Sequence, residues 1–220
     1  YEICACLVGS EMCIRDRLVI VLMTSCGEYQ SLLKSNDYNL VYKKAIEYYN
    51  KGDYQRAMNL LDGVRSVFVG QAKAQNIAYY RAFCSYNMKD YQIASDLFKQ
   101  FIQTYPESSF AEECLYMMGF CDYKASPKPR LDQQVTEKAI REFQLYLSRY
   151  PYSMRKDKVN TYMDEMRDKL SYKAYLSAKN YYLREHYKAA VISLQNCLKD
   201  YPGSKYREEI MYMLFVCLLY

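Results

Sequence analysis

Two pairs of adjacent glutamates come closest, in type and spacing, to residues that could do acid–base chemistry. Glu112 with Glu113, and Glu208 with Glu209, would be paired carboxylates that donate and accept a proton. Both pairs, however, stand at the same place in a repeated segment, in the first turn of an expected helix, where negative charge offsets the helix dipole. The single histidine, His186, occupies a turn position that aspartate fills in other repeats. We therefore expect no catalytic residue and no enzyme activity.

Glycines and cysteines also lack the spacing that phosphate or metal binding requires. The nearest two glycines, Gly63 and Gly70, are seven residues apart, whereas a phosphate-cradling loop needs them closer. No CxxC pair occurs, and one histidine is too few for a usual zinc site. The sequence predicts neither a metal site nor a cofactor.

Four of the nine cysteines fall in helical apolar patterns. Free cysteine packs as a small hydrophobic residue, so we expect these thiols in the core. They are Cys84, Cys114, Cys121 and Cys197.

Composition favours long helices. The chain has 220 residues, 51% of them hydrophobic, with only 7 glycines and 5 prolines against 27 tyrosines, so it has little material for the tight turns of an all-β fold. The net charge of +5 comes from interspersed basic and acidic residues rather than from a polybasic block. Nucleic acid is therefore not an expected partner.

A Tyr-Pro-x-Ser tetrapeptide occurs three times, beginning at Tyr105, Tyr150 and Tyr201. The likeness of two copies extends further, since residues 106–117 and 202–213 are identical at six of twelve positions. Proline ends one helix, and the serine can accept hydrogen bonds from the free amides that begin the next. Each copy therefore predicts a junction between two helices.

Apolar residues spaced three and four apart precede these junctions, which is the period of an amphipathic helix. Each of these amphipathic helices is preceded by a partner helix, from which a short polar turn separates it. The partner helix carries a small residue twelve positions before an alanine of the amphipathic helix. Small residues that face each other let two helices approach closely, so each unit is expected to be a helical hairpin. The pairs are Ala45 with Ala57, Ala82 with Ala94, and Ala178 with Ala190.

This pattern, with the string Gly52-Asp53-Tyr54-x-x-Ala57 and the closing Tyr-Pro, resembles the tetratricopeptide repeat. The resemblance implies an all-α fold, a solenoid of about five helical hairpins. The last hairpin would begin at about Ser204 and is cut short.

Two intervals depart from the repeat. Gly119 and Ala139 are twenty residues apart instead of twelve, which predicts an insertion around residues 126–134 in the third hairpin. Ala139 and Ala190 are fifty-one apart, which predicts a long second helix or an added helix near residues 153–170.

Each expected first helix carries two tyrosines seven residues apart, three before and four after its small residue. Residues seven apart share a helical face, so stacking of hairpins would align the rings into two rows. The rings would either pack between neighbouring hairpins or line a groove for an extended peptide with aromatic residues. We take the groove as the candidate site, lined by Tyr42, Tyr49, Tyr79, Tyr86, Tyr116, Tyr123, Tyr175 and Tyr182.

Three basic residues lie near the same helices. Arg81, Lys124 and Lys179 are candidates to hold a peptide carboxylate, and the alternative is that water alone solvates them.

A short apolar run, residues 18–23, follows Arg15 and Arg17 and precedes small residues. Six residues cannot span a bilayer, but this arrangement is typical of an export signal. Met23-Thr24-Ser25-Cys26 resembles the lipobox of bacterial lipoproteins. The resemblance implies that the thiol of Cys26 is the site of lipid attachment.

Both ends of the sequence look like translated sequencing adapter, which predicts that they are not native. The expected boundaries are 1–17 non-native, 18–25 the remnant of a lipoprotein signal, 26–37 a linker, 38–215 the solenoid, and 216–220 a non-native tail.

The cysteine motif, the linker and the hairpins with Tyr-Pro junctions together resemble the BamD family of outer-membrane assembly lipoproteins, over roughly residues 18–215. The resemblance implies a scaffold on the periplasmic face of the outer membrane, anchored there through acylated Cys26. It also implies two partners, the periplasmic domains of a BamA-like barrel protein and the C-terminal signals of unfolded outer-membrane proteins. Such a signal is apolar and aromatic at alternate positions, which suits a groove lined by tyrosine.

Two other functions are compatible with helical repeats. One is a periplasmic lipoprotein that coordinates envelope or cell-wall synthesis, which would share the fold and the anchor. The other is a cytosolic adaptor that holds chaperone tails by a carboxylate clamp, but this clamp needs lysine, asparagine and arginine where the present sequence has tyrosine.

Overall fold

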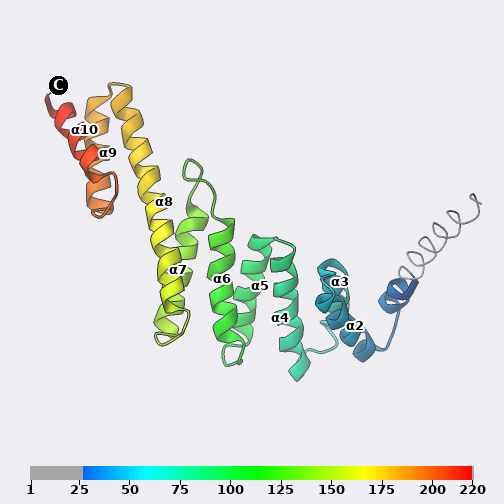
Figure 1. Ribbon diagram of the computed structural model, residues 1–220. Helices are drawn as coiled ribbons and strands as arrows, with labels where there is room; N and C mark the ends of the chain where they lie inside the picture. The colour runs from blue at the N-terminus through cyan, green and yellow to red at the C-terminus, as the bar shows by residue number, and fades with distance from the viewer. Residues whose placement is uncertain (1–26, 220) are drawn as a thin grey trace, which may run out of the picture. The chain divides into compact units, whose positions relative to one another are not determined.

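The computed structural model describes residues 27–219, which form two compact units, unit one ending at Met88 and unit two beginning at Lys89. Every regular element in this range is a helix (Figure 1), which confirms the predicted all-α class and is consistent with a helical solenoid. None of the described helices is both long and apolar enough to cross a membrane. The predictions for Cys26 and for residues 1–25 lie outside the described residues.

Three helices follow a helical segment at residues 27–33 in unit one: α2 (Tyr38–Asn50), α3 (Tyr54–Val64) and α4 (Ala72–Asn87). α2 and α3 pack as the first predicted hairpin, and α4 packs on α3. The buried residues of their shared core are aliphatic except for Phe68 and Cys84, and they include Leu32 from the entering segment. Burial of this apolar surface is what holds the three helices together.

Unit two contains the remaining helices: α5 (Tyr91–Thr104), α6 (Ala111–Ala125), α7 (Gln134–Arg149), α8 (Lys156–Leu183), α9 (Tyr187–Asp200) and α10 (Arg207–Leu219). Each packs on the next along the chain, as the ribbon of Figure 1 shows, and α10 also contacts α8. The core of the last three helices is built around Ala178, Ala190, Leu194 and Ile210.

The three Tyr-Pro-x-Ser junctions have the same structure. The serine hydroxyl accepts a hydrogen bond from the amide two residues on, at 3.3 Å in Ser108, 3.2 Å in Ser153 and 3.2 Å in Ser204. In each copy the tyrosine carbonyl also accepts from the serine amide, at 3.0 to 3.2 Å. The serine therefore accepts from a junction amide, but this amide belongs to the residue just before the helix and not, as predicted, to the first turn of the helix.

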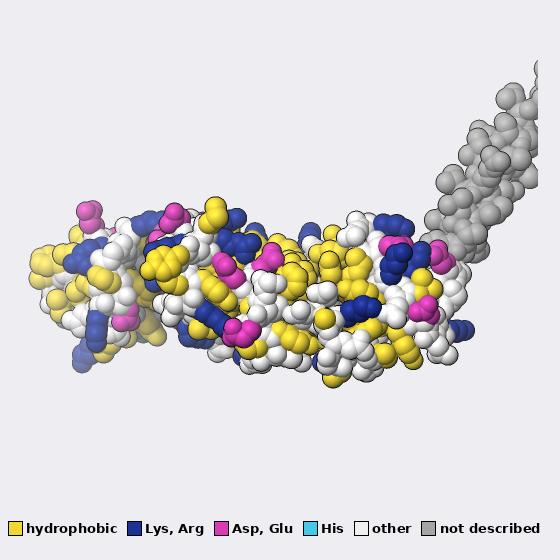
Figure 2. All heavy atoms as spheres, turned by 90° about the horizontal axis from the view of Figure 1, so that it is seen from below, with side chains coloured by type: hydrophobic (Ala, Val, Ile, Leu, Met, Phe, Trp, Pro, Cys, Tyr) yellow, Lys and Arg dark blue, Asp and Glu magenta, His cyan; other side chains and the backbone are white. Residues whose placement is uncertain are grey.

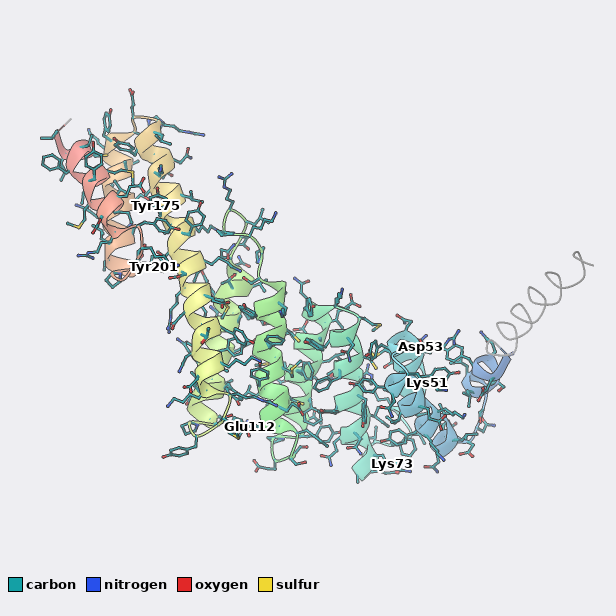
Figure 3. The ribbon with its side chains drawn as sticks, viewed as in Figure 1. Lys51, Asp53, Lys73, Glu112, Tyr175 and Tyr201 are labelled. Atoms are coloured by element: carbon teal, nitrogen blue, oxygen red, sulfur yellow. The ribbon has the colours of Figure 1, made fainter. Side chains whose placement is uncertain are left out.

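The turns inside the hairpins also share one geometry. The middle residue has a positive φ, 82° at Gly52, 67° at Lys89 and 59° at Glu185. Glycine adopts this conformation without strain, whereas the other two residues hold it at a cost in free energy. The next residue is the N-cap of the following helix, and at Asp53 (labelled in Figure 3) the side chain accepts from the Arg56 amide at 3.2 Å.

The small residues of the hairpin pattern are buried. The alanines of the three predicted pairs and Ala139 are fully buried. In the third hairpin the small residue is Gly119, and a Cβ placed on it would lie 2.8 Å from Cδ1 of Phe143. The four core cysteines are buried free thiols, and Cys217 of α10 is buried as well.

The long interval after Ala139 is filled by one continuous helix. α7 has an ordinary length, and residues 156–170 belong to the 28-residue α8, the first helix of the fourth hairpin. The sequence had predicted a long second helix or a separate added one. A single helix forms because no glycine or proline interrupts residues 156–183.

Candidate functional site

The two predicted site tyrosines of α2, Tyr42 and Tyr49, are half-buried in unit one. Tyr42 lies with its ring centroid 6.1 Å from that of Phe68, and the ammonium of Lys73 (labelled in Figure 3) lies 5.8 Å from the Tyr42 centroid. The rings of Tyr49 and Tyr80 meet edge to face, with centroids 5.0 Å apart. Both α2 rings are therefore fixed by packing while part of each stays exposed.

α4 presents an aromatic row in the same unit. The ring centroids of Tyr79 and Phe83 are 4.5 Å apart, and those of Phe83 and Tyr86 are 6.4 Å apart. All three side chains are half-buried. Phe83 was not predicted as a site residue, although its position four residues after Tyr79 places it on the same face of the helix.

In unit two, Tyr116 of α6 is buried, with 7% of its surface exposed. Its ring meets that of Tyr146 of α7 at a centroid distance of 5.9 Å, and the Arg155 guanidinium lies 4.7 Å from its centroid. Burial raises the pKa of Tyr116. This tyrosine is part of the packing between α6 and its neighbours.

Tyr123, two turns further along the same face of α6, remains partly exposed. Its ring stacks on Tyr162 of α8 with centroids 4.5 Å apart, and its hydroxyl donates to Oε2 of Glu165 at 2.5 Å. The hydrogen bond to Glu165, followed by burial, raises the pKa of Tyr123 to about 12. Phe120 lies beside both rings, 6.0 Å from Tyr123 and 5.5 Å from Tyr162.

Tyr175 of α8 is buried against α10. Its ring stacks on Tyr206 with centroids 4.4 Å apart, and the Lys179 ammonium donates both to its hydroxyl at 2.7 Å and to Oε1 of Glu209 at 2.8 Å. Tyr182 is half-buried against the core of α8, α9 and α10.

The eight predicted tyrosines therefore differ in exposure. Tyr116 and Tyr175 are buried by packing against neighbouring residues, although Tyr175 is also among the residues that line a groove on α8, and a peptide groove formed by the tyrosines stays a prediction. Tertiary packing buries them, because the rings of Tyr146 and Tyr206, thirty or more residues away in the sequence, cover the rings of Tyr116 and Tyr175. The other six are half-buried and keep part of each ring accessible.

Tyr162 is a further aromatic residue on this face that the repeat pattern missed. It lies in the first half of α8, which has no counterpart in an ordinary hairpin. The buried residues Val159, Met163 and Met166, spaced three and four apart, were the signal that could have extended the helix face through it.

The three predicted anchor cations have different surroundings. Arg81 donates from Nε to Oδ1 of Asp62 at 2.5 Å, and Lys179 pairs with Glu209. The Lys124 ammonium lies 5.2 Å from the ring centroid of Phe120. Of the three, only Lys124 forms no salt bridge with another residue in the range 27–219.

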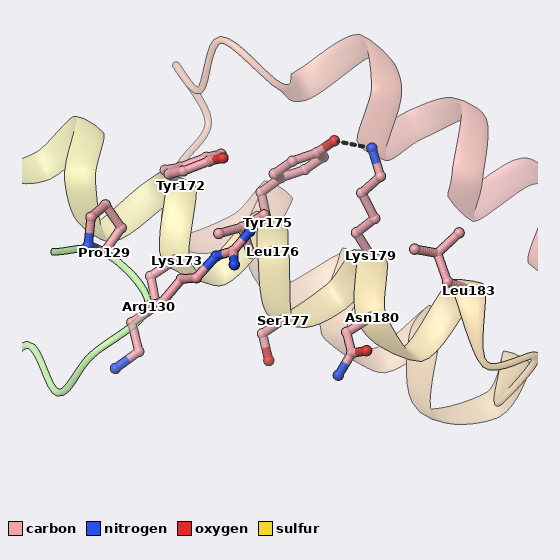
Figure 4. Close-up of a pocket in the computed structure, with 10 residues that line it drawn as sticks. All are labelled: Pro129, Arg130, Tyr172, Lys173, Tyr175, Leu176, Ser177, Lys179, Asn180 and Leu183. Atoms are coloured by element: carbon pink, nitrogen blue, oxygen red, sulfur yellow. Dashed lines mark hydrogen bonds between the residues drawn. The ribbon is translucent and has the colours of Figure 1, made fainter.

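A groove runs along one face of α8 beside the inserted loop (Figure 4). Its volume is about 590 Å³, and its lining includes Pro129 and Arg130 from the loop with Lys173, Leu176 and Leu183 from α8. The ionisable lining residues other than tyrosine are all cationic. The insertion at residues 126–134 thus forms one wall of a cationic groove.

A cluster of ionisable residues lies between α5, α6 and α7, with Asp122 and Glu142 buried and Asp96 exposed. The Lys138 ammonium lies 2.9 Å from Oδ2 of Asp122, 3.7 Å from Oε1 of Glu142 and 3.8 Å from Oδ1 of Asp96. Asp122 and Glu142 are both buried, and one lysine cannot neutralise both. Burial, and then the neighbouring Asp122, raise the pKa of Glu142 well above its ordinary value.

The glutamate pairs of the sequence have structural partners. Glu112 (labelled in Figure 3) accepts from the Ser153 hydroxyl at 2.7 Å and from the Tyr146 hydroxyl at 3.0 Å. Glu209 holds Lys179, as described above. On the face drawn in Figure 2, basic and acidic side chains are interspersed among apolar ones.

One comparison with known proteins gives a match. A family model named YfiO, described as an outer membrane lipoprotein, matches residues 34–216, which is most of the chain. A search of curated proteins finds no match.

Proposed function

The chain belongs to the YfiO family of outer membrane lipoproteins, which is BamD-like, and on this premise we propose that it is a non-catalytic scaffold of the machinery that assembles β-barrel proteins in the outer membrane. The observation that carries the proposal is the family match across residues 34–216, the same range that forms helical repeats. Stacked helical hairpins expose extended surfaces and are suited to holding other proteins.

The first proposed partner is a BamA-like barrel protein, docked through its periplasmic domains. The second is the C-terminal signal of an unfolded outer-membrane protein, bound as an extended strand with aromatic residues at alternate positions. Within each unit the partly exposed rings support this, because tyrosine offers broad amphipathic contact at a low entropic cost. In unit one they are Tyr42, Tyr49, Tyr79 and Tyr86, and in unit two Tyr123 and Tyr182.

Attachment to the membrane would use Cys26, on the periplasmic face of the outer membrane. Each buried methylene of an acyl chain contributes about 0.8 kcal/mol, and one chain alone gives only marginal binding, so stable attachment needs several chains. A Cys26→Ala variant should therefore move from the membrane fraction to the soluble periplasm. Retention of this variant in membranes would contradict the lipid anchor.

The experiment that tests the scaffold function is purification of the tagged lipoprotein from membranes, followed by mass spectrometry of what accompanies it. Enrichment of a β-barrel protein with periplasmic domains is the expected result. Enrichment of peptidoglycan enzymes without the barrel protein would contradict the proposal, and would favour the alternative of a lipoprotein that coordinates cell-wall synthesis.

A further inference from the structure

The groove on α8 is cationic because two of its basic residues have no acidic partner. Among residues 27–219, Lys173 and Arg130 form no salt bridge, and the Lys173 ammonium donates instead to the backbone carbonyl of Leu131 at 2.9 Å. The third cation, Lys179, is neutralised by Glu209. The end of the groove near the inserted loop therefore carries two uncompensated positive charges.

The inserted loop holds its wall of the groove in place through internal hydrogen bonds. Buried Gln133 donates from Nε2 to the carbonyls of Lys128 and Leu131, at 2.8 and 3.1 Å. The Thr136 hydroxyl donates to Oε1 of Gln133 at 2.7 Å. The loop that carries Arg130 is therefore preorganised in the absence of a ligand, which lowers the entropic cost of binding there.

Apolar surface continues along the same face of α8. Tyr172, Leu176 and Leu183 line the groove, and Leu183 is 67% exposed. The eleven steps of helix from residue 172 to residue 183 rise about 16 Å, which is the length of about five residues of extended peptide. The groove is thus long enough for a short strand and offers it positive charge at the loop end and apolar contact along α8.

We propose that this groove binds an extended segment of a partner protein with acidic residues at one end, next to Arg130 and Lys173, and apolar residues along the rest. The charge of the lining selects for carboxylates, and the length and apolar part of the lining select for a peptide over a small anion. The inference deepens the proposed function, on which it rests, because it names the chemistry of one segment that the scaffold would hold.

The test uses the full chain and synthetic peptides in a fluorescence anisotropy titration. The probe is a pentapeptide, Glu-Glu-Leu-Ala-Leu, labelled with an uncharged dye and blocked at both ends so that neither the dye nor a terminal carboxylate contributes negative charge. We expect saturable binding, at least about fivefold weaker for Arg130→Glu and for a peptide with glutamine in place of glutamate. Leu183→Ser should also weaken it, because the apolar contact is lost.

The matched control is Lys188→Glu, which makes the same change of net charge on an exposed residue of α9 outside this groove. This variant should bind the peptide as the unaltered chain does. Arg130→Gln with Lys173→Gln keeps hydrogen-bond donors on both side chains, so it separates loss of charge from loss of the contact with Leu131. We expect it to bind weakly as well.

Several outcomes would overturn the inference. One is the absence of saturable binding up to about 1 mM peptide, and another is an equal loss of peptide affinity in Arg130→Glu and Lys188→Glu. A third is full displacement of the peptide by inorganic phosphate or by vesicles that contain an anionic lipid. The last is self-association of the chain that Arg130→Glu abolishes. The purification described above reports separately on the proposed function. A chain that captures the barrel protein but not the peptide overturns only the inference, and the reverse result overturns only the proposed function.

Discussion

Gly119 of α6 faces the ring of Phe143 of α7, so closely that a Cβ on the glycine would lie 2.8 Å from Cδ1 and 3.0 Å from Cε1 of that ring. Phe143 is fully buried and has no free space to move into. The absence of a side chain at residue 119 is therefore what sets the distance between the two helices of the third hairpin.

Gly119→Ala should lower the free energy of unfolding by about 1 to 3 kcal/mol, because the added methyl group forces the Phe143 ring or α7 to shift. Urea unfolding followed by far-ultraviolet circular dichroism measures this. The control is Gly63→Ala in α3, where a Cβ meets nothing within 4 Å, and which should stabilise by about 0.5 to 1 kcal/mol. Equal effects of the two substitutions would refute the packing explanation.

Ser153 is the most connected of the three junction serines. Its hydroxyl donates to Glu112 at 2.7 Å, lies 2.6 Å from the Tyr146 hydroxyl and accepts from the Arg155 amide at 3.2 Å. Ser153→Ala should therefore cost about 1 to 2 kcal/mol of stability, since the charged Glu112 carboxylate loses a donor and the Arg155 amide loses its acceptor. In the same urea assay Ser108→Ala, which removes a bond to the Phe110 amide, should cost less. The reverse order would show that the bond to Glu112 contributes nothing.

The sequence predicted the junctions and turns well because both depend on residues that are close in the chain. Proline, serine and the residue of positive φ act within one turn of helix, so their effects can be read from a few letters. The same holds for Cys84 and Cys197, whose apolar neighbours recur with the helical period.

What could not be predicted depends on contacts between distant residues. Tyr116 and Tyr123 are indistinguishable by local pattern, yet the first is buried and the second is partly exposed. Their difference is decided by Tyr146, Tyr162 and the length of α8, which places a ring beside Tyr123 that the repeat does not contain. The ion cluster at Lys138 could not be predicted from the sequence for the same reason, since its members come from three helices.

The buried carboxyl of Glu142 should make stability depend on pH. Its pKa is higher in the folded chain than in the unfolded chain, so the folded state holds the proton more tightly and is favoured while the group is protonated. This contribution is full below the ordinary pKa of 4.5 and is lost as pH rises through the raised value. Stability contributed by Glu142 should therefore fall as pH rises from about 5 to above neutrality.

Glu142→Gln removes this titration and should flatten the fall in melting temperature over that range. The control is Glu137→Gln, an exposed glutamate of the same helix, which should leave the pH dependence as it is in the unaltered chain. If both variants gave the unaltered profile, the raised pKa would not be coupled to unfolding.

Substitutions of Tyr123 can test whether its ring binds client signals or only packs against its neighbours. Its stacking on Tyr162 holds the ring in place, while its hydroxyl is occupied by Glu165 and is not available to a ligand. Under the proposed function, therefore, the ring face and not the hydroxyl should contact a client signal. Tyr123→Phe should keep binding of a synthetic C-terminal signal peptide from a β-barrel protein, whereas Tyr123→Ala should weaken it about fivefold or more, since one aromatic contact is worth about 1 kcal/mol. The measurement is a titration with labelled peptide, and circular dichroism shows whether each variant is folded. Folded Tyr123→Ala with unaltered affinity would exclude this ring from the site, and equal loss in both variants would assign the contact to the hydroxyl instead.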